Sequence, residues 1–248
     1  MSKVVLITGG AGGIGSAIAR KLGQEGYDVV INYLTSKQKA ESLAKQLHED
    51  YGVRTLAIRA DVAKEEEVDA MVSVIEETLG GVDILINNAA IDLPDLFVNK
   101  TADQLRQVLD VNVVGAYNCA ARVYKHMLQQ EYGRIINISS TNGINTYYPV
   151  CFDYDLSKAA LNSLTHDLAV QFAPFVNVNA IAAGFIGTEK ELEGYDEEFL
   201  KQETEKILVR RYGQPEEVAS LVAFLISDEA DFINNSIIRL DGGQYGSC

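Results

Sequence analysis

The chain alternates between two apolar patterns. Short runs rich in β-branched residues, typical of buried strands, are separated by longer stretches in which apolar residues recur with helical period. The short runs predict strands at Val4–Thr8, Val29–Asn32, Thr55–Ala60, Ile84–Asn87, Arg134–Ser139, Asn177–Ala182 and Ser236–Leu240. The longer stretches predict helices near Gly15–Glu25, Lys37–Tyr51, Glu65–Leu79, Ala102–Gln130, Asp155–Phe172 and Pro215–Ser227.

Seven strands with intervening helices predict an α/β fold. The expected architecture is a Rossmann-type doubly wound fold, in which right-handed crossovers form a parallel sheet with helices on both faces. We expect residues 1–248 to form a single domain, because no linker rich in Pro, Gly or Ser divides the chain. Ligands of such sheets bind beyond the carboxyl ends of the strands.

One charged stretch, from Phe185 to Leu208, interrupts the alternation after the sixth strand. An insertion of this length at the carboxyl end of a sheet is expected to form a lid over a ligand, so we predict a substrate lid at about 185–208. The alternative is a pair of solvated surface helices.

Composition and charge limit the kinds of molecule that the protein is expected to bind. The net charge of −14 repels nucleic-acid phosphates and anionic lipid surfaces. No segment approaches the ~20 apolar residues of a membrane span, and the first residues lead directly into a strand, so the cytoplasm is the expected location. We expect no metal site, because the cysteines and histidines lack ligand spacing: Cys119, Cys151 and Cys248, and His48, His126 and His166.

The stretch "LITGGAGGIGSAIA" places glycines between a strand and a helix. Such a helix N-terminus binds anions, because its N–H groups and dipole face them and glycine lets the backbone approach closely. A nucleoside-triphosphate loop is disfavoured, because Ser16 and Ala17 follow Gly15 where Lys and Ser or Thr are required. Two registers fit: Gly10, Gly12 and Gly15 as G-x-G-x-x-G, or Thr8, Gly9, Gly13 and Gly15 as T-G-x-x-x-G-x-G.

Tyr154 and Lys158 are four residues apart and therefore share one face of the predicted helix. A phenol with its ordinary pKa of ~10 is a poor acid–base catalyst at neutral pH. A nearby ammonium would lower that pKa, so the pair is a candidate general acid/base.

A series of motifs in one order resembles the short-chain dehydrogenase/reductase family, from Lys3 to about Gln244. The motifs are "TGGAGGIG" at Thr8–Gly15, "ADV" at Ala60–Val62, "NNAA" at Asn87–Ala90, Asn112 in "DVNVVGA", "NISS" at Asn137–Ser140, "YDLSK" at Tyr154–Lys158, "NAIAAG" at Asn179–Gly184 and "DGG" at Asp241–Gly243. Within the family the chain is similar to bacterial 3-oxoacyl-carrier-protein reductases and to related sugar and hydroxysteroid dehydrogenases. It departs from the family pattern at Ala90, commonly glycine, and at Ala183, commonly proline.

The resemblance implies a nicotinamide dinucleotide, with the pyrophosphate on the second glycine register. The implied cofactor-binding residues are Thr8, Gly9, Gly13, Ile14, Gly15, Asn32, Tyr33, Ser36, Asp61, Val62, Asn88, Ala89, Ala90, Tyr154, Lys158, Gly184 and Ile186. We expect NADP(H) to be favoured over NAD(H), because Asn32 and Tyr33 end the second strand and no acidic residue follows before Glu41 to repel a 2′-phosphate. Gly12 and Leu34, where phosphate-selective relatives often carry basic residues, make the expected preference mild.

The resemblance also implies the catalytic residues. Tyr154 would be the general acid/base, and Lys158 would also hold the ribose hydroxyls. Ser140, chosen over Ser139, would hydrogen-bond the substrate oxygen. Asn112 would anchor a water in a proton path to Lys158, unless it is a solvent-facing helical residue.

We expect the partner to be a small-molecule ketone or secondary alcohol. Docking of an acidic carrier protein is disfavoured by the net charge and by the neutral residues Gln129, Gln130 and Asn177, where basic residues are usual. Candidate substrate contacts are Ser140, Asp92, Tyr147, Tyr148, Cys151 and Phe152. The alternatives are a 3-oxoacyl-carrier-protein reductase and, from another class, a dinucleotide-sensing regulator without catalysis. A homotetramer or homodimer is expected by resemblance, through the helices at 102–130 and 155–172 and the C-terminal strand.

Overall fold

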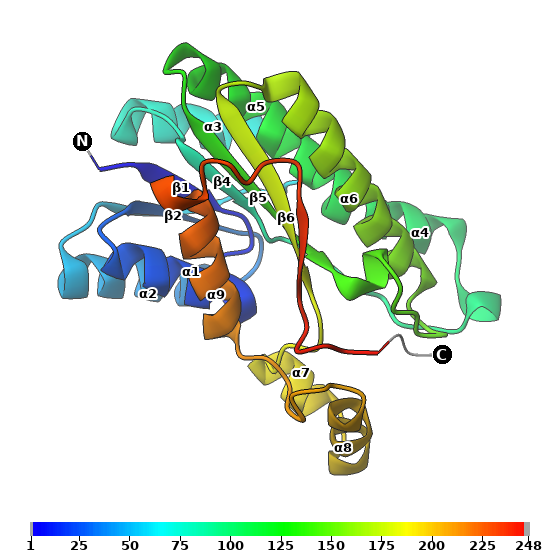
Figure 1. Ribbon diagram of the computed structural model, residues 1–248. Coiled ribbons are helices and arrows are strands. Elements are labelled where there is room, and N and C mark those ends of the chain that lie inside the picture. The colour runs from blue at the N-terminus through cyan, green and yellow to red at the C-terminus, as the bar shows by residue number, and fades with distance from the viewer. Residues whose placement is uncertain (1, 246–248) are drawn as a thin grey trace.

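The computed structural model describes residues 2–245 and contains one seven-stranded parallel sheet (Figure 1). Its strand order is β3-β2-β1-β4-β5-β6-β7, so the order reverses direction between β1 and β4. The strands are β1 (Val4–Ile7), β2 (Asp28–Tyr33), β3 (Thr55–Arg59), β4 (Ile84–Asn87), β5 (Gly133–Ser140), β6 (Val176–Ala183) and β7 (Ile237–Leu240). The doubly wound Rossmann-type fold predicted from the alternating pattern is therefore confirmed.

Helices cover both faces of the sheet, and each face encloses a hydrophobic core. On one face, α1 (Gly13–Gln24), α2 (Lys37–Tyr51) and α9 (Pro215–Ile226) pack their apolar sides on the strands. On the other face, α3 (Glu65–Leu79), α5 (Gly115–Gln129) and α6 (Phe152–Phe172) do the same. Burial on both faces explains why the central strands read as continuous apolar runs.

The predicted helix Ala102–Gln130 is interrupted. Helix α4 (Ala102–Leu109) is joined to α5 by a π-helical turn at Asp110–Val114, which holds one more residue than an α-helical turn. Apolar periodicity does not reveal this turn, because the amphipathic pattern continues on both sides of it. The start of α6 is also three residues earlier than predicted, at Phe152 rather than Asp155.

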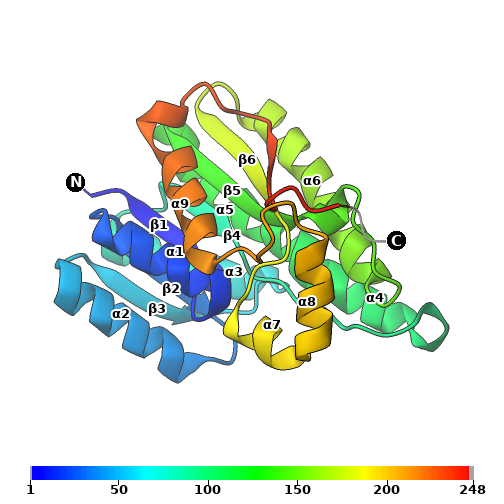
Figure 2. The same ribbon diagram turned by 60° about the horizontal axis from the view of Figure 1, so that its bottom comes forward.

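The segment 185–208 folds into two short helices, α7 (Glu189–Gly194) and α8 (Glu197–Glu205). Figure 2 shows them beyond the carboxyl ends of the central strands, apart from the layers that cover the sheet. The segment is fixed near both ends, because Ile186 bridges to Gly213 and Ile207 bridges to Gln244. The outer sides of the two helices are solvated, and their inner side faces the cavity described below.

In the part of the chain that the structure describes, no helix is both long and apolar enough to span a membrane. The same residues contain no cluster of three His, Cys, Asp or Glu side chains arranged to hold a metal ion. Cys119 and Cys151 are free thiols, and Cys248 lies outside the described residues.

The close packing around Gly15 in the glycine loop predicts how a substitution there changes stability. A Cβ at Gly15 would lie 2.6 Å from the Gly9 carbonyl oxygen and 2.9 Å from the Gly10 Cα, whereas a Cβ at Gly12 would meet nothing within 4 Å. We expect Gly15→Ala to lower the free energy of unfolding by about 1–3 kcal/mol, as overpacking does. Gly12→Ala, the matched control, should cost less than about 1 kcal/mol, because only an N-cap residue changes. Urea unfolding followed by circular dichroism measures both, and equal losses would contradict the close packing at Gly15.

Candidate active site

A cavity of about 340 Å³ opens at the carboxyl ends of β4, β5 and β6, and residues of α7 and α8 line its outer side. It brings together many of the residues that the sequence predicts for the site: Ile14, Asn88, Ala90, Asp92, Ser140, Tyr148, Cys151, Tyr154, Lys158, Gly184 and Ile186. These residues come from segments far apart in the sequence, and parallel pairing places the ends of their strands at one edge of the sheet.

The two serines that end β5 have different surroundings. Ser140 Oγ donates to Asn142 Oδ1 at 3.1 Å, accepts from the Asn142 backbone N–H, and lies close enough to Tyr154 to lower the pKa of its phenol. Ser139 Oγ instead donates to Asn162 Oδ1 on α6 at 2.7 Å. The hydroxyl of Ser140 is therefore the one placed beside Tyr154.

Tyr154 is in the first turn of α6, and a buried ion pair fixes this end of the helix. The Asp153 side chain accepts from the Tyr154 backbone N–H at 3.0 Å and pairs with Lys100. Lys100 also donates to the Leu93 carbonyl, and both charged side chains are almost fully buried. The pair thus joins the loop after β4 to the helix that carries Tyr154.

Lys158 lies one turn further along α6, with its Nζ 5.3 Å from the centroid of the Tyr154 ring. Its Nζ donates to the Ile138 carbonyl at 2.8 Å. Burial lowers the pKa of Lys158 to about 8, because the charged form is poorly solvated. The tyrosine and lysine therefore lie on one side of α6, as their spacing predicts.

The expected lowering of the Tyr154 pKa by an ammonium is not seen in this structure. Burial raises this pKa above its ordinary value, and the charges of Asp92 and Glu191 raise it further, whereas the hydrogen bond with Ser140 lowers it. The neighbouring Lys158 directs its Nζ to the Ile138 carbonyl, and burial lowers the pKa of this lysine. The raised pKa keeps Tyr154 an uncharged phenol, which holds its proton more tightly than a free phenol does.

The glycine loop is tied to the loop after β4. Thr8 Oγ1 accepts from the backbone N–H groups of Asn88 and Ala89 at 2.9 and 3.0 Å. The Asn88 side chain donates to the carbonyls of Thr8 and Gly9. Gly9 and Gly13 have φ of 61° and 50°, a conformation that favours glycine. The second register therefore contains the two loop positions at which the backbone requires glycine.

Asn32 differs from its predicted role at the cofactor ribose. Its side chain is buried, accepts from the Gly9 backbone N–H at 3.2 Å and donates to the Ala60 carbonyl at 3.0 Å. It therefore joins β2 to the glycine loop and to the end of β3. The inward direction follows from the Gly9 and Ala60 backbone groups that surround the side chain, which belong to segments distant in sequence.

The residues predicted for the adenosine end lie at the same edge of the sheet. Tyr33 ends β2 and is buried, whereas Ser36 is exposed and precedes α2. Asp61 follows β3, and its carboxylate accepts from the Ala63 backbone N–H at 3.1 Å. Val62 is buried, and its carbonyl accepts from Asn118 at 2.9 Å.

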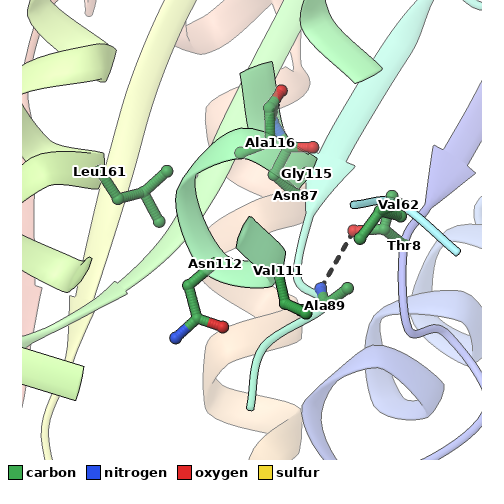
Figure 3. A pocket seen from close by; sticks show the side chains of 9 residues that line it. All are labelled: Thr8, Val62, Asn87, Ala89, Val111, Asn112, Gly115, Ala116 and Leu161. Carbon is green, nitrogen blue, oxygen red and sulfur yellow. Dashed lines mark hydrogen bonds between the residues drawn. The ribbon is translucent and has the colours of Figure 1, made fainter. Parts of the chain in front are cut away.

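Asn112 lies in the π-helical turn and is 2 % exposed, which excludes the solvent-facing alternative. Its side chain forms hydrogen bonds with both the N–H and the carbonyl of Ile91, and its amide donates to Ser157 Oγ at 2.9 Å. Ser157 in turn donates to the Tyr154 carbonyl at 2.7 Å. Figure 3 shows Asn112 on the π-helical turn among the residues that line a second, small pocket, which include Thr8, Val62 and Ala89 from neighbouring segments.

Two predicted substrate contacts do not line the cavity. The Tyr147 side chain is 57 % exposed, and its hydroxyl donates to the Ile144 carbonyl. The Phe152 ring packs against Phe97, with ring centroids 5.1 Å apart. Phe152 is the first residue of α6, which begins three residues before the predicted Asp155, and it does not line the cavity.

Other residues line the cavity that sequence reasoning did not single out: Thr141, Asn142, Phe185, Thr188, Glu191, Tyr195, Phe199 and Gln244. Five of them, from Phe185 to Phe199, belong to the segment 185–208, for which the predicted lid was the signal. Asn142 and Gln244 had no such signal. Gln244 Oε1 accepts from the Phe185 backbone N–H at 3.1 Å, so the C-terminal segment completes the cavity wall.

Comparison with known proteins identifies the family. The family model described as enoyl-(acyl carrier protein) reductase matches residues 9–244. The 3-oxoacyl-[acyl-carrier-protein] reductase FabG of Staphylococcus epidermidis is 37% identical over 246 residues, which cover 99% of this chain and 100% of that protein. The chain belongs to the short-chain dehydrogenase/reductase family.

Other proteins similar to this chain have names that refer to different substrates. The 3beta-hydroxysteroid dehydrogenase 1 of Eggerthella lenta is 36% identical, over 98% of this chain and 93% of that protein. A crystal structure of a gluconate 5-dehydrogenase from Burkholderia cenocepacia, in complex with NADP and tartrate, has a TM-score of 0.91 at 30% identity and covers 98% of this chain and 95% of that chain.

This membership establishes the class of reaction. The chain is an NAD(P)-dependent oxidoreductase that interconverts a ketone and an alcohol. The predicted membership and enzyme class are confirmed, and the alternative of a regulator without catalysis is not retained.

Proposed function

We propose that this enzyme reduces a ketone, or oxidises the corresponding secondary alcohol, on a small molecule, with Tyr154 as general acid/base. The observation that carries the proposal is that Ser140, Tyr154 and Lys158 meet in one cavity that the glycine loop also borders through Ile14. No other arrangement of acid–base groups predicted from the sequence is brought together there.

The residues of the glycine loop fit a dinucleotide. The space above Gly12 is open, since a Cβ there would meet nothing within 4 Å, and the N-terminus of α1 begins at this point. We assign Gly9, Gly13, Ile14 and Gly15 to the pyrophosphate, because backbone N–H groups at a helix N-terminus bind phosphate. When bound, the nicotinamide supplies or accepts the hydride.

The proton chemistry follows from the contacts of Tyr154. In reduction its phenol donates a proton to the substrate oxygen, and in oxidation the phenolate takes the alcohol proton. Ser140 donates a hydrogen bond to the same oxygen and stabilises the charge that develops there. The buried Lys158, when charged, favours the phenolate that Tyr154 becomes after it donates its proton.

Asn112 is proposed to position the site through its hydrogen bonds. It holds the Ile91 peptide and, through Ser157, the carbonyl of Tyr154. A water path from Asn112 to Lys158, the role implied by the resemblance, stays a prediction. The same is true of the lid formed by residues 185–208, whose inner side lines the cavity.

The homotetramer or homodimer and the cytoplasmic location also stay predictions. Apolar side chains exposed on two of the helices expected at the interface support an assembly: Tyr117 on α5 is 54 % exposed and Val170 on α6 is 72 % exposed.

Removal of the phenolic hydroxyl should affect chemistry without affecting the fold. Tyr154→Phe keeps the ring but has no proton to donate, so kcat should fall by ~10² or more. Stopped-flow or steady-state measurement of cofactor absorbance gives kcat, and titration of cofactor fluorescence tests that binding survives. Retention of most of kcat would refute the role of Tyr154.

Ser140→Ala should reduce kcat on the same step, because the hydrogen bond to the substrate oxygen is lost. Ser139→Ala serves as the matched comparison, and a larger loss of kcat in Ser139→Ala would transfer the role to Ser139.

We also propose that the enzyme favours NADP(H) over NAD(H), with mild discrimination. Tyr33 and Leu34, at the carboxyl end of β2, provide no carboxylate against a 2′-phosphate, and Leu34 is 45 % exposed. The complex of a gluconate 5-dehydrogenase with NADP, a relative of the same fold, supports this choice. Because Asn32 is buried, the position at which to test the proposal is Leu34.

A carboxylate at residue 34 should repel the phosphorylated cofactor. Leu34→Asp should lower kcat/KM for NADP(H) about tenfold more than for NAD(H), about 1.4 kcal/mol, whereas the uncharged control Leu34→Asn should leave the ratio near its native value. Steady-state kinetics with both cofactors measures these ratios. A native preference of tenfold or more for NAD(H) would overturn the proposed choice.

A second candidate, a 3-oxoacyl-carrier-protein reductase, is favoured by the identity of 37% to FabG proteins. Two features of the structure bear on it. Gln130 forms hydrogen bonds with Asp83 and the Tyr132 carbonyl and offers no positive charge to an acidic carrier. Asn177 is buried and donates to the Asp231 carbonyl, so its neutral side chain, counted above against docking, is not part of a docking surface.

The two candidates differ in how the substrate is carried. We expect a 3-oxoacyl thioester on an acyl carrier protein to be no better a substrate than the same acyl group on a small thioester, because the surface offers no cationic docking site at Gln129 and Gln130. Steady-state kinetics compares kcat/KM for the two. A large preference for the carrier-bound thioester would place the enzyme in fatty-acid synthesis.

A further inference from the structure

Two carboxylates line the cavity beside the reacting groups. Asp92 follows β4 on one side, and Glu191 is in α7 on the other. Both line the same cavity as Tyr154, and the charge of each raises the pKa of the Tyr154 phenol. The charge of Asp92 also raises the pKa of Glu191, so the two carboxylates repel each other.

No nearby cation fully neutralises the two carboxylates within the described part of the chain. Among the described residues that line the cavity, Lys158 is the basic one, and its Nζ is directed to the Ile138 carbonyl. Lys100 is paired with Asp153 and its charge also lowers the pKa of Asp92, and the charge of Lys190 lowers the pKa values of both Asp92 and Glu191. These charges offset the effect of burial only in part, because the pKa of each carboxyl group is still raised. Neither carboxylate forms an ion pair with a described residue.

Burial raises the pKa values of both carboxyl groups, which means that their charged forms are poorly solvated. The Cys151 thiol lies beside Asp92, with Sγ 3.9 Å from Oδ2. Burial and the surrounding acids raise the pKa of this thiol to about 12, so it contributes no charge at neutral pH. A positive charge between Asp92 and Glu191 would therefore stabilise both ionised carboxylates.

The outer wall of the cavity is aromatic. The Tyr195 ring stacks on Phe199 with centroids 4.2 Å apart, and it meets Phe185 edge-on at 6.3 Å. Tyr148 completes this wall, and its hydroxyl donates to the buried Glu203 at 2.6 Å. Lys206, which is paired with Glu203, lies over the Tyr148 ring with Nζ 6.0 Å from the centroid, so this ring already contacts a cation. Aromatic faces attract cations, and together with nearby carboxylates they form the kind of surface that binds ammonium groups.

We infer that the substrate of this cavity is a ketone or secondary alcohol that carries a protonated amine, with the ammonium between Asp92 and Glu191 and against the aromatic wall formed by Tyr148, Tyr195 and Phe199. This inference rests on the proposed function and names its substrate class. A substrate with a carboxylate or phosphate group is repelled by the same two residues, and a neutral substrate gains no charge pairing from them.

A set of three ring ketones of similar size tests the charge. The probes are N-methylpiperidin-4-one, which is cationic when protonated, 4-methylcyclohexanone, which is neutral, and 4-oxocyclohexanecarboxylate, which is anionic. With the native enzyme at neutral pH, kcat/KM for the amine should exceed that for the neutral ring by about tenfold or more, about 1.4 kcal/mol, and the anion should be the poorest substrate.

Substitutions test whether Asp92 and Glu191 cause the preference for the amine over the neutral ring. Asp92→Asn and Glu191→Gln should each reduce the ratio of amine to neutral kcat/KM, and the double variant should bring it close to one. Glu193→Gln is the matched control, because Glu193 is exposed on the same helix and does not line the cavity; it should leave the ratio unchanged.

The outcomes separate the two proposals. Reduction of the neutral ring at a rate equal to or above that of the amine overturns the substrate class but leaves the oxidoreductase site intact. A ratio that persists in the double variant also overturns it. Failure to reduce any of the three rings, or any other small ketone, would instead overturn the proposed function itself.

Discussion

The site depends on the carboxyl ends of β1 and β4, two paired strands between which the strand order reverses, so that the segments after them lead to opposite faces of the sheet. The diverging segments expose backbone groups at the strand ends, and here one hydroxyl and one amide satisfy them. Thr8 Oγ1 accepts from two consecutive N–H groups after β4, and the Asn88 amide donates to two consecutive carbonyls after β1. Removal of either partner would leave buried backbone groups without hydrogen bonds, at about 1–3 kcal/mol each. The glycine loop, the loop that carries Asp92 and the start of α1 all take their positions from this exchange.

Most of the fold follows from the apolar pattern. A strand buried on both faces has to be continuously apolar, and helices that cover a sheet need one apolar side, so Val4–Ile7, Ile84–Asn87 and Lys37–Tyr51 are readable at nearly their true bounds. The π-helical turn at Asp110–Val114 was not readable, because it depends on the contacts of Asn112 with Ile91 and Ser157, which lie far away in the sequence. Local periodicity carries no information about such partners.

The sequence predicted which residues take part in the site better than it predicted their orientation and surroundings. The spacing of Tyr154 and Lys158 predicted a shared helix face, and the family resemblance, more than the spacing, selected Ser140; all three line one cavity in the structure. The direction of the Tyr154 pKa shift was not predictable, because it depends on burial and on Asp92 and Glu191, which approach it from other segments. The inward orientation of Asn32 likewise depends on the Gly9 and Ala60 backbone groups that surround it. Pattern matching identifies residue types, whereas desolvation and long-range contacts decide what each one does.

The two bridges at the base of the α7–α8 segment have a consequence for how the protein can change. Ile186–Gly213 and Ile207–Gln244 hold the two ends of the segment, and the residues between them touch the cavity but contribute little to either hydrophobic core. Mutations between these anchor points therefore alter the shape and charge of the cavity at small cost to folding, whereas the core layers resist change. Substitutions in this segment can therefore change which substrates the enzyme accepts over evolutionary time, while the sheet and the proton-transfer groups stay the same.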